Sequence, residues 1–125
     1  MEKNLEIFSD IEACPIRNVL DRFGDKWSVL ILLVLGEVDK MRFNELYKTI
    51  GSISQKMLTS TLRILEADGL VKRTIFPEIP PRVEYEITER GDSLLVHIRA
   101  LVDWARGNME AIKESRNRFE NKGVL

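Results

Sequence analysis

SISQKMLTSTLRILEADGLVKR, residues 52–73, is the stretch that decides the fold we predict for this sequence. Successive residues of a helix lie ~100° apart, so the apolar side chains of this stretch gather on one flank and the polar ones on the other. The polar flank consists of Gln55, Lys56, Thr59, Ser60 and Arg63. Ser54 can cap the helix at its N-terminus, and Ser52 with Gln55 also fits a capping box. We therefore predict a helix over residues 54–68 whose outer flank is polar.

Three more helices are predicted before this stretch. Apolar residues recur at helical spacing in CPIRNVLDRFG (residues 14–24) and in MRFNELYKTIG (residues 41–51). Between them, DKWSVLILLVLGE (residues 25–37) is apolar almost all round, which predicts a buried central helix. Only GSI (residues 51–53) separates the third helix from the fourth, and a short glycine-containing joint of this kind is typical of a helix-turn-helix.

Two strands and a long helix are predicted after it. The apolar period changes to two in VKRTIF (residues 71–76) and RVEYEIT (residues 82–88), which predicts strands. The connection PEIPP (residues 77–81) is stiffened by its prolines, so we expect a hairpin whose wing spans residues 76–82. Thr88 then caps a last helix, in which Gly107 could introduce a break.

The predicted fold is mainly α with a small β-hairpin, a winged helix-turn-helix with N- and C-terminal dimerisation helices. Residues 1–13 are predicted to form an arm that contacts a dimer partner. Residues 14–90 are predicted to form the DNA-binding domain, and residues 91–125 the C-terminal dimerisation helix or helices.

The composition excludes several classes of protein. At 125 residues, with 44% hydrophobic and 31% charged residues, the chain can form one globular domain with its own core. The N-terminus lacks the pattern of a signal peptide, and the longest apolar run is too short for a bilayer, so we expect a cytoplasmic protein with no membrane partner. One cysteine and one histidine, without a Cys/His cluster, predict no internal disulfide and no metal site. No nucleophile–base pair or glycine-rich phosphate loop stands out, so we expect no enzyme and no cofactor.

The polar flank of the helix over residues 54–68 suits a nucleic-acid groove. Between Ser54 and Leu65 the helix carries two bases and no acids, and a helix N-terminus attracts phosphate. A flank that is merely solvated would show the same pattern, but a helix-turn-helix followed at once by a hairpin favours DNA binding. Residues 54–90 carry six bases and six acids, so they have no net positive charge to attract DNA. The affinity for DNA should therefore come from a few specific contacts made by two copies of the chain.

Four motifs resemble those of a known family. They are CP at residues 14–15, GDKW at residues 24–27, ISQKML at residues 53–58 and PPRVEY at residues 80–85. Occurring in this order, they resemble the HxlR-type family of bacterial winged helix-turn-helix regulators, which are relatives of the MarR group. The resemblance covers residues 13–106.

This resemblance implies a homodimer that binds a pseudo-palindromic operator in double-stranded DNA and regulates transcription. The helix over residues 54–68 would enter the major groove, and the wing would contact the backbone or the minor groove. The predicted DNA-binding residues lie on the outer flank of that helix and around the wing: Ser54, Gln55, Lys56, Thr59, Ser60, Arg63, Arg73, Pro80, Pro81 and Arg82. The alternative is a winged helix that binds only proteins, which would show no salt-dependent affinity for DNA.

The last helix and the N-terminal arm predict a dimer interface. Apolar residues recur at three- and four-residue steps along this helix, after the winged helix is complete. The predicted interface residues are Leu5, Ile7, Phe8, Leu94, Ile98, Leu101, Trp104 and Ala105. The alternative is that this stripe is buried within one chain. A two-fold dimer would place its half-sites ~34 Å apart, or at a multiple of that distance.

Cys14 is a candidate redox sensor. It stands at the N-terminal edge of the first helix, where the helix dipole favours a thiolate. The family resemblance implies the same, since some HxlR-type regulators use a cysteine here to sense quinones, aldehydes or disulfide stress. The effector would be a reactive electrophile or an oxidant, acting by S-alkylation, a mixed disulfide or a Cys14–Cys14′ bridge. The alternative is a buried thiol that behaves as a small apolar side chain.

Overall fold

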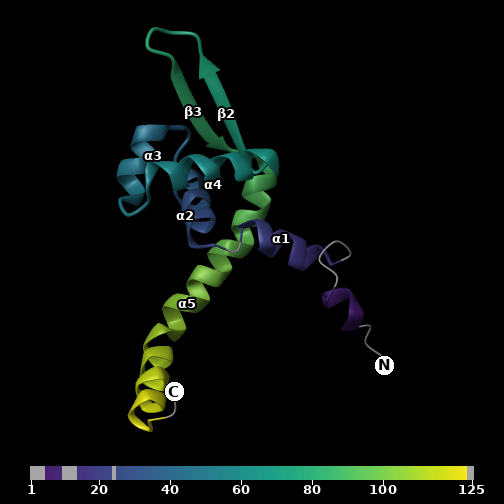
Figure 1. Ribbon diagram of the computed structural model, residues 1–125, viewed down its shortest axis with the longest axis vertical. Helices are drawn as coiled ribbons and strands as arrows, with labels where there is room; N and C mark the ends of the chain where they lie inside the picture. The colour runs from purple at the N-terminus through teal and green to yellow at the C-terminus, as the bar shows by residue number, and fades with distance from the viewer. Residues whose placement is uncertain (1–4, 10–13, 24, 124–125) are drawn as a thin grey trace.

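The computed structural model describes residues 5–9, 14–23 and 25–123, with the side chains at positions 7, 8 and 23 left out. Helices and strands alternate in the order expected of a winged helix (Figure 1). The elements are η1 (Leu5–Phe8), α1 (Pro15–Phe23), α2 (Lys26–Gly36), β1 (Met41–Arg42), α3 (Phe43–Ile50), α4 (Gln55–Ala67), β2 (Val71–Phe76), β3 (Arg82–Ile87) and α5 (Glu89–Asn121). Most of the arm predicted over residues 1–13 lies outside the described residues, as do the side chains of Ile7 and Phe8 that were assigned to the interface.

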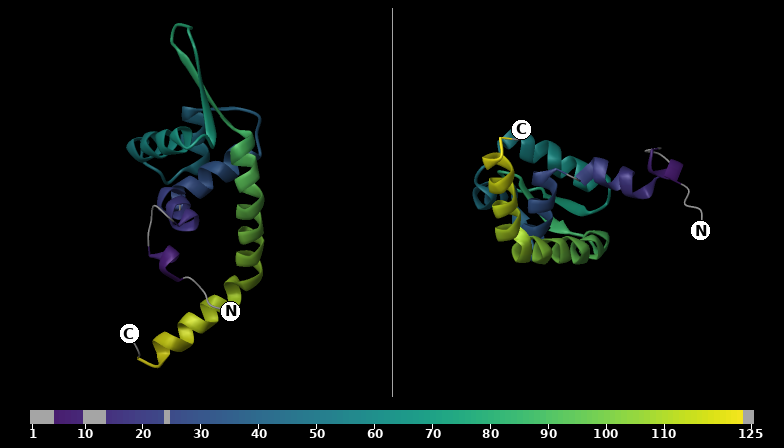
Figure 2. Two further views of the ribbon diagram at one scale, coloured as in Figure 1. Left: turned by 90° about the vertical axis from the view of Figure 1, so that its right-hand side faces the viewer. Right: turned by 90° about the horizontal axis from the view of Figure 1, so that it is seen from below.

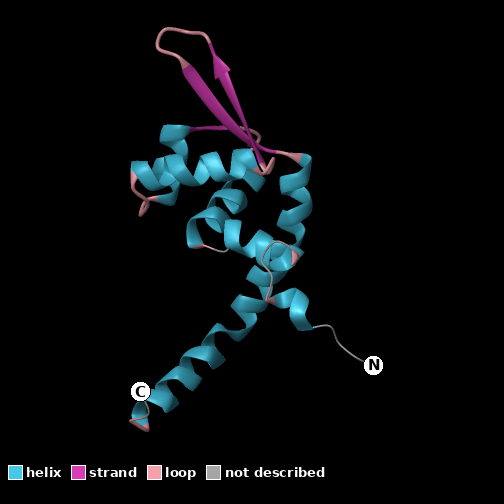
Figure 3. Ribbon diagram, turned by 45° about the vertical axis from the view of Figure 1, so that its right-hand side comes forward, coloured by secondary structure: helices cyan, strands magenta, loops and turns pink. Residues whose placement is uncertain are grey.

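Helix α2 forms the centre of the core, as its nearly continuous apolar sequence predicts. Its residues Ile31, Leu32 and Leu35 are fully buried, against Leu46 of α3 and the inner flank of α4. The helix begins where the Asp25 side chain accepts hydrogen bonds from two backbone N–H groups, each at 2.9 Å. This core supports α4 from below and leaves its outer flank free (Figure 3).

The joint between α3 and α4 has the geometry predicted for a helix-turn-helix. Helix α3 ends at Gly51, which adopts a φ of 81°, a value that costs glycine little. Helix α4 begins after Ser54, whose Oγ accepts a hydrogen bond from Met57 N at 3.1 Å. Ser54 is therefore the N-cap, and the alternative start at Ser52 is not adopted.

The sheet has three strands, one more than the predicted hairpin. Strands β2 and β3 form the hairpin, and β1 pairs with the other edge of β3 in the order β1-β3-β2. All pairs are antiparallel, with Met41 opposite Tyr85. A two-residue strand is too short to show an alternating pattern, so the sequence contained no signal for β1.

Helix α5 packs on the core along its first half and projects beyond it along the second. Thr88 caps its start by accepting a hydrogen bond from Gly91 N at 3.1 Å. The helix is continuous through Gly107, so the break that the sequence allowed does not occur, although the helix bends in its yellow-green part (Figure 2). Among the described helices, none combines the length and the apolarity that crossing a membrane requires.

Candidate nucleic-acid interface

The outer flank of α4 is polar and fully accessible. All five side chains predicted on it, from Gln55 to Arg63, are exposed. The opposite flank buries Leu58, Leu62 and Leu65 in the core. The buried Thr61 hydroxyl donates a hydrogen bond to Met57 O at 2.7 Å, so it leaves no polar group unpaired inside. The predicted separation of the two flanks is confirmed.

Ion pairs occupy most of the acids in residues 54–90, a segment that is described throughout. Glu78 and Glu84 both lie against Arg82, at 3.0 and 3.4 Å. Asp68 binds Arg22, and Glu86 lies 3.9 Å from Lys40, so two cations from outside the segment also take part. These pairs neutralise acids that the sequence count set against the bases.

Five of the six cations of the same segment have no carboxylate within ion-pair distance, and all five side chains are exposed. Lys56 and Arg63 lie on α4, Lys72 and Arg73 lie on β2, and Arg90 lies at the start of α5. The equal count of six bases and six acids therefore hides an uneven distribution, in which four of the five uncompensated positive charges lie on α4 and the adjoining strand. A phosphate backbone is the natural partner of such a surface.

A small notch joins α4 to the sheet and brings three of the predicted residues together. Its volume is about 160 Å³, and Thr59, Arg63 and Arg73 line it together with Glu66 and Tyr85. Two guanidinium groups and one carboxylate leave a net charge of +1 there, and guanidinium groups bind phosphate oxygens in a bidentate manner. Glu66 and Tyr85 were not among the predicted site residues. The proximity of Tyr85 depends on how the sheet packs beside α4, whereas Glu66 lies three residues after Arg63 on the same helix and could have been found from the sequence.

The wing tip holds its only cation in internal contacts. Arg82 lies between two carboxylates, and its guanidinium carbon is 4.1 Å from the centroid of the Phe76 ring. Pro80 and Pro81 are exposed, and the neighbouring Ile79 is exposed completely. Arg82 thus lies at the predicted position, but its charge is compensated by Glu78 and Glu84, while its buried Nε has no hydrogen-bond partner.

The residues predicted for the dimer interface divide into two groups. Ile98 lies in the intrachain core with 4% of its surface exposed, so its assignment to the interface is corrected; Leu94 is half-buried beside it. Leu101 and Trp104, one to two turns further along α5, are 64% and 58% exposed, and Ala105 is partly exposed. The stripe begins against α2 and turns outward only where α5 leaves the core.

Helix α1 presents a second exposed apolar surface. Ile16, Val19 and Leu20 share one face of the helix, and all three are exposed, as is Leu5 before it. Figure 1 and the right-hand view of Figure 2 show η1 and α1 extending outward from the side of the molecule. Their helical spacing is visible in the sequence, but the sequence analysis assigned no role to this face.

Cys14 is buried, with 1% of its surface exposed, and it is a free thiol. Its place just before α1 agrees with the predicted helix start at Pro15. Burial limits access of an oxidant to the sulfur. Among the described residues, no group of three or more histidine, cysteine, aspartate or glutamate side chains could hold a metal ion.

Comparison with known families gives a match to the HxlR-like helix-turn-helix family over residues 22–113. The HTH-type transcriptional regulator YtfH of Escherichia coli K12 is 40% identical over 106 residues, which cover 85% of this chain and 83% of that protein. These relatives are transcriptional regulators and not enzymes.

Two solved structures extend the similarity to three dimensions. The transcriptional regulator YtfH from Salmonella typhimurium has a TM-score of 0.76 at 37% identity, covering 93% of this chain and 99% of that one. The redox regulator HypR in its reduced form has a TM-score of 0.75 at 37% identity, covering 80% of this chain and 98% of that one.

Proposed function

Because the chain belongs to the HxlR-like helix-turn-helix family and is a transcriptional regulator, we propose that it acts as a homodimer on a pseudo-palindromic DNA operator. The observation that carries this proposal is the distribution of charge. Within residues 54–90, four of the five cations without carboxylate partners lie on α4 and β2, where a duplex would meet the polar flank of α4. A winged helix that served only as a protein adaptor would need no such concentration of unpaired positive charge.

In this proposal α4 lies in the major groove. Gln55 and Lys56, in its first turn, are placed to contact base edges, while the N-terminus and the Ser54 cap face the phosphates. Thr59 and Ser60 extend the same surface. Arg63, together with Arg73 of β2, holds one phosphate in the notch between helix and sheet.

The wing contributes differently. Since Arg82 is held by Glu78 and Glu84, we assign it a role in shaping the tip rather than in binding phosphate strongly. The exposed surface of Pro80 and Pro81 would lie against the minor groove, where apolar side chains contact sugar and base edges.

The dimer in this proposal forms through α1 and the outer part of α5. Their exposed apolar side chains are Leu5, Ile16, Val19, Leu20, Leu101 and Trp104. Contiguous apolar surface of this kind is typical of an interface, and a two-fold axis would bring two α4 helices to one face of the duplex. Leu101→Glu should convert the dimer to a monomer, as measured by light scattering, and should weaken operator binding with it.

The central experiment first selects bound sequences from random DNA and then measures affinity by fluorescence anisotropy at several salt concentrations. The double variant Lys56→Ala, Arg63→Ala should lose about 100-fold in affinity, since a good base contact contributes about 1–3 kcal/mol and a charge-assisted phosphate contact about 1.5–3 kcal/mol. The control double variant Arg106→Ala, Lys113→Ala removes two exposed cations of α5 and should bind as the parent does. Absence of any salt-dependent DNA affinity in the parent would establish the protein-adaptor alternative instead.

A second candidate property is thiol control through Cys14, favoured by the 37% identity to the redox regulator HypR. The sulfur is buried in one chain, so the oxidant would have to reach it through a local opening of the protein around Cys14. Diamide should then change the operator affinity of the parent and leave that of Cys14→Ser unaltered. An identical response of the two proteins would exclude Cys14 as the sensor.

A further inference from the structure

The outer end of the wing is apolar and exposed. Ile79 is exposed completely, and Pro80 and Pro81 beside it are exposed as well. Ile75, on β2 just before the turn, is 55% exposed. Four neighbouring apolar residues at the end of a hairpin are more than the single exposed side chain that most protein surfaces carry, and such a cluster indicates a contact surface.

The same end of the wing offers no free positive charge. Arg82 is the one cation between Phe76 and Val83, a segment that is described throughout. Its charge is compensated by Glu78 and Glu84, at 3.0 and 3.4 Å. Proteins that read the negative potential of a narrow minor groove insert an arginine, lysine or histidine whose charge is available. This tip can instead bring apolar surface into a groove.

The face of the hairpin beside α4 changes from charged to apolar along its length. Arg73 lies opposite Tyr85 in the ladder, and both line the notch with Arg63 of α4. Ile75 lies opposite Val83, two positions or about 7 Å nearer the tip, so this pair continues the same face. A duplex with one phosphate in the notch would therefore meet apolar side chains beyond that phosphate.

The hairpin is long enough to reach the next groove of the duplex. The six residues of β2, at about 3.3 Å each, extend about 20 Å from a start close to the end of α4. Adjacent major and minor grooves are about half of a ~34 Å turn apart, which is about 17 Å. Figures 1 and 3 show the hairpin projecting well beyond α3 and α4. With α4 in the major groove, the tip reaches the minor groove beside it.

The DNA backbone that separates the two grooves has room to pass. A groove of about 950 Å³ lies between the wing tip and the start of α3, with walls formed by residues 42–45 and 78–83. Arg42 in this wall is exposed and forms no ion pair within the described part of the chain. The Glu45 carboxylate accepts a hydrogen bond from the backbone N–H of Arg42 at 2.9 Å. A phosphate in this groove would meet one uncompensated guanidinium group.

An apolar side chain distinguishes base pairs in the minor groove by a single group. Every base pair presents acceptors there, and a G·C pair adds the N2 amino group of guanine as a donor. Because the acceptors are common to all pairs, covering them does not discriminate. Covering the amino group leaves a buried donor without an acceptor, which is costly. An apolar contact at the floor of this groove therefore favours A·T over G·C.

We propose that Ile79, supported by Ile75, is a specificity-determining residue that selects A·T base pairs by excluding the guanine amino group from the minor groove. Arg42 holds the backbone that passes between the wing tip and α3, and it contributes no base preference. This inference rests on the proposed function, because it assigns the sequence preference of one part of the same interface.

A protein partner is the competing occupant of the apolar tip. The surface next to the tip carries the uncompensated cations Arg42, Lys72 and Arg73. A partner that covered both would have to join an apolar contact to closely spaced negative charges. A duplex provides phosphates at regular spacing and the floor of a groove between them, so the charges favour DNA.

The test uses the full chain and the operator obtained by selection from random DNA, with base analogues that change only the minor groove. In the A·T pairs about half a turn from the contact of α4, 2-aminoadenine in place of adenine adds the amino group. It should weaken binding about 5- to 30-fold, as expected of one unpaired donor. Replacing the same pair by G·C should cause a similar loss, and inosine·C, which lacks the amino group, should restore the affinity.

Three variants separate the side chain of Ile79 from the rest of the wing. Ile79→Ser should reduce the loss caused by 2-aminoadenine to less than twofold, with an unchanged melting temperature because the residue is exposed. Ile79→Leu, the matched control, should retain the loss. Arg42→Ala should weaken binding of all these duplexes by the same factor and lower the magnitude of the salt slope by about 0.9.

An equal loss with 2-aminoadenine in the parent and in Ile79→Ser would overturn the proposal, as would the absence of any loss in the parent. In both cases the parent still binds the operator, so the proposed function stands and the tip is left for a protein partner. If the parent binds no duplex, the proposed function fails and this proposal fails with it.

Discussion

Helix α4 with the adjoining strand β2 and the wing tip both carry arginines, yet the two regions hold them in opposite ways. Arg63 on α4 and Arg73 beside it on β2 have no carboxylate within ion-pair distance, whereas Arg82 at the tip has two. Helix α4 is anchored by three buried leucines, while the tip ends in a completely exposed isoleucine. The difference teaches that the presence of an arginine near DNA says little until its intramolecular partners are known.

The largest expected effect comes from breaking the anchor of α4. Leu58→Ala should lower the free energy of unfolding by about 2–5 kcal/mol, because a fully buried leucine leaves a cavity in the core. Ile79→Ala at the tip should change it by less than about 0.5 kcal/mol, as expected of an exposed side chain. Urea unfolding followed by circular dichroism measures both, and equal losses would contradict the contrast between the two regions.

The second largest effect is expected from removing Arg63 and Arg73, the two arginines without carboxylate partners. Arg63→Ala with Arg73→Ala should reduce operator affinity about 30- to 100-fold, since two charge-assisted phosphate contacts are lost together. The slope of log affinity against log salt should also fall in magnitude by about 0.9, because one phosphate is no longer neutralised. A loss of affinity with an unchanged salt slope would show that these arginines do not contact phosphate.

Removing the two carboxylate partners of Arg82 should make the wing tip resemble α4 and the adjoining strand, where the arginines have no such partners. Glu78→Gln with Glu84→Gln removes both carboxylates that lie against Arg82 and two negative charges near the duplex. DNA affinity should rise about 5- to 10-fold, mostly for non-specific sequences, because phosphate contacts carry no sequence information. Anisotropy with operator and scrambled DNA measures this, and a fall in affinity would show that the acids themselves contact the DNA side.

The smallest effect is expected from removing the side chain of Arg82 itself. Arg82→Ala should reduce operator affinity by less than about threefold, because an exposed ion pair contributes only about 0–1 kcal/mol. Arg63→Ala alone, measured in parallel, serves as the matched control and should cost more. If Arg82→Ala is the more damaging of the two, the assignment of Arg82 to shaping the tip is wrong.

The errors of the sequence analysis have specific physical causes. Ile98 has the right spacing for the outer stripe, but periodicity does not tell which turn of a long helix leaves the core. Strand β1 has two residues, which is too few to show a period. The exposed face of α1 was recognised as apolar, yet only the packing of the chain shows that nothing in the described residues covers Ile16 and Leu20.

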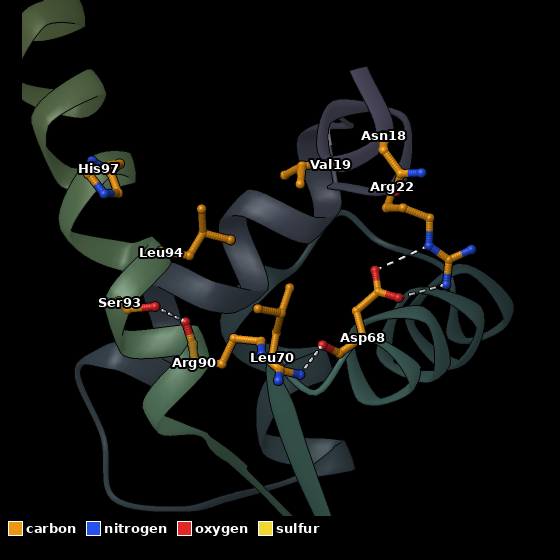
Figure 4. A pocket seen from close by; sticks show the side chains of 9 residues that line it. All are labelled: Asn18, Val19, Arg22, Asp68, Leu70, Arg90, Ser93, Leu94 and His97. Carbon is orange, nitrogen blue, oxygen red and sulfur yellow. Dashed lines mark hydrogen bonds and ion pairs between the residues drawn. The ribbon is translucent and has the colours of Figure 1, made fainter. Parts of the chain in front are cut away.

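What the sequence determined by itself is local. The helix over Gln55–Ala67, its Ser54 cap, its two flanks and the hairpin that follows all arise from periods, caps and turn residues within a few positions of one another. What only the tertiary structure decided is which charges remain free and where a cavity forms. Arg22 and Asp68 stand 46 positions apart, and their ion pair exists because the folded chain places α1 beside the end of α4 (Figure 4). Two charged side chains neutralise each other only when they lie within a few ångströms. The partner of each charge therefore depends on the fold and cannot be found by counting charges along the sequence.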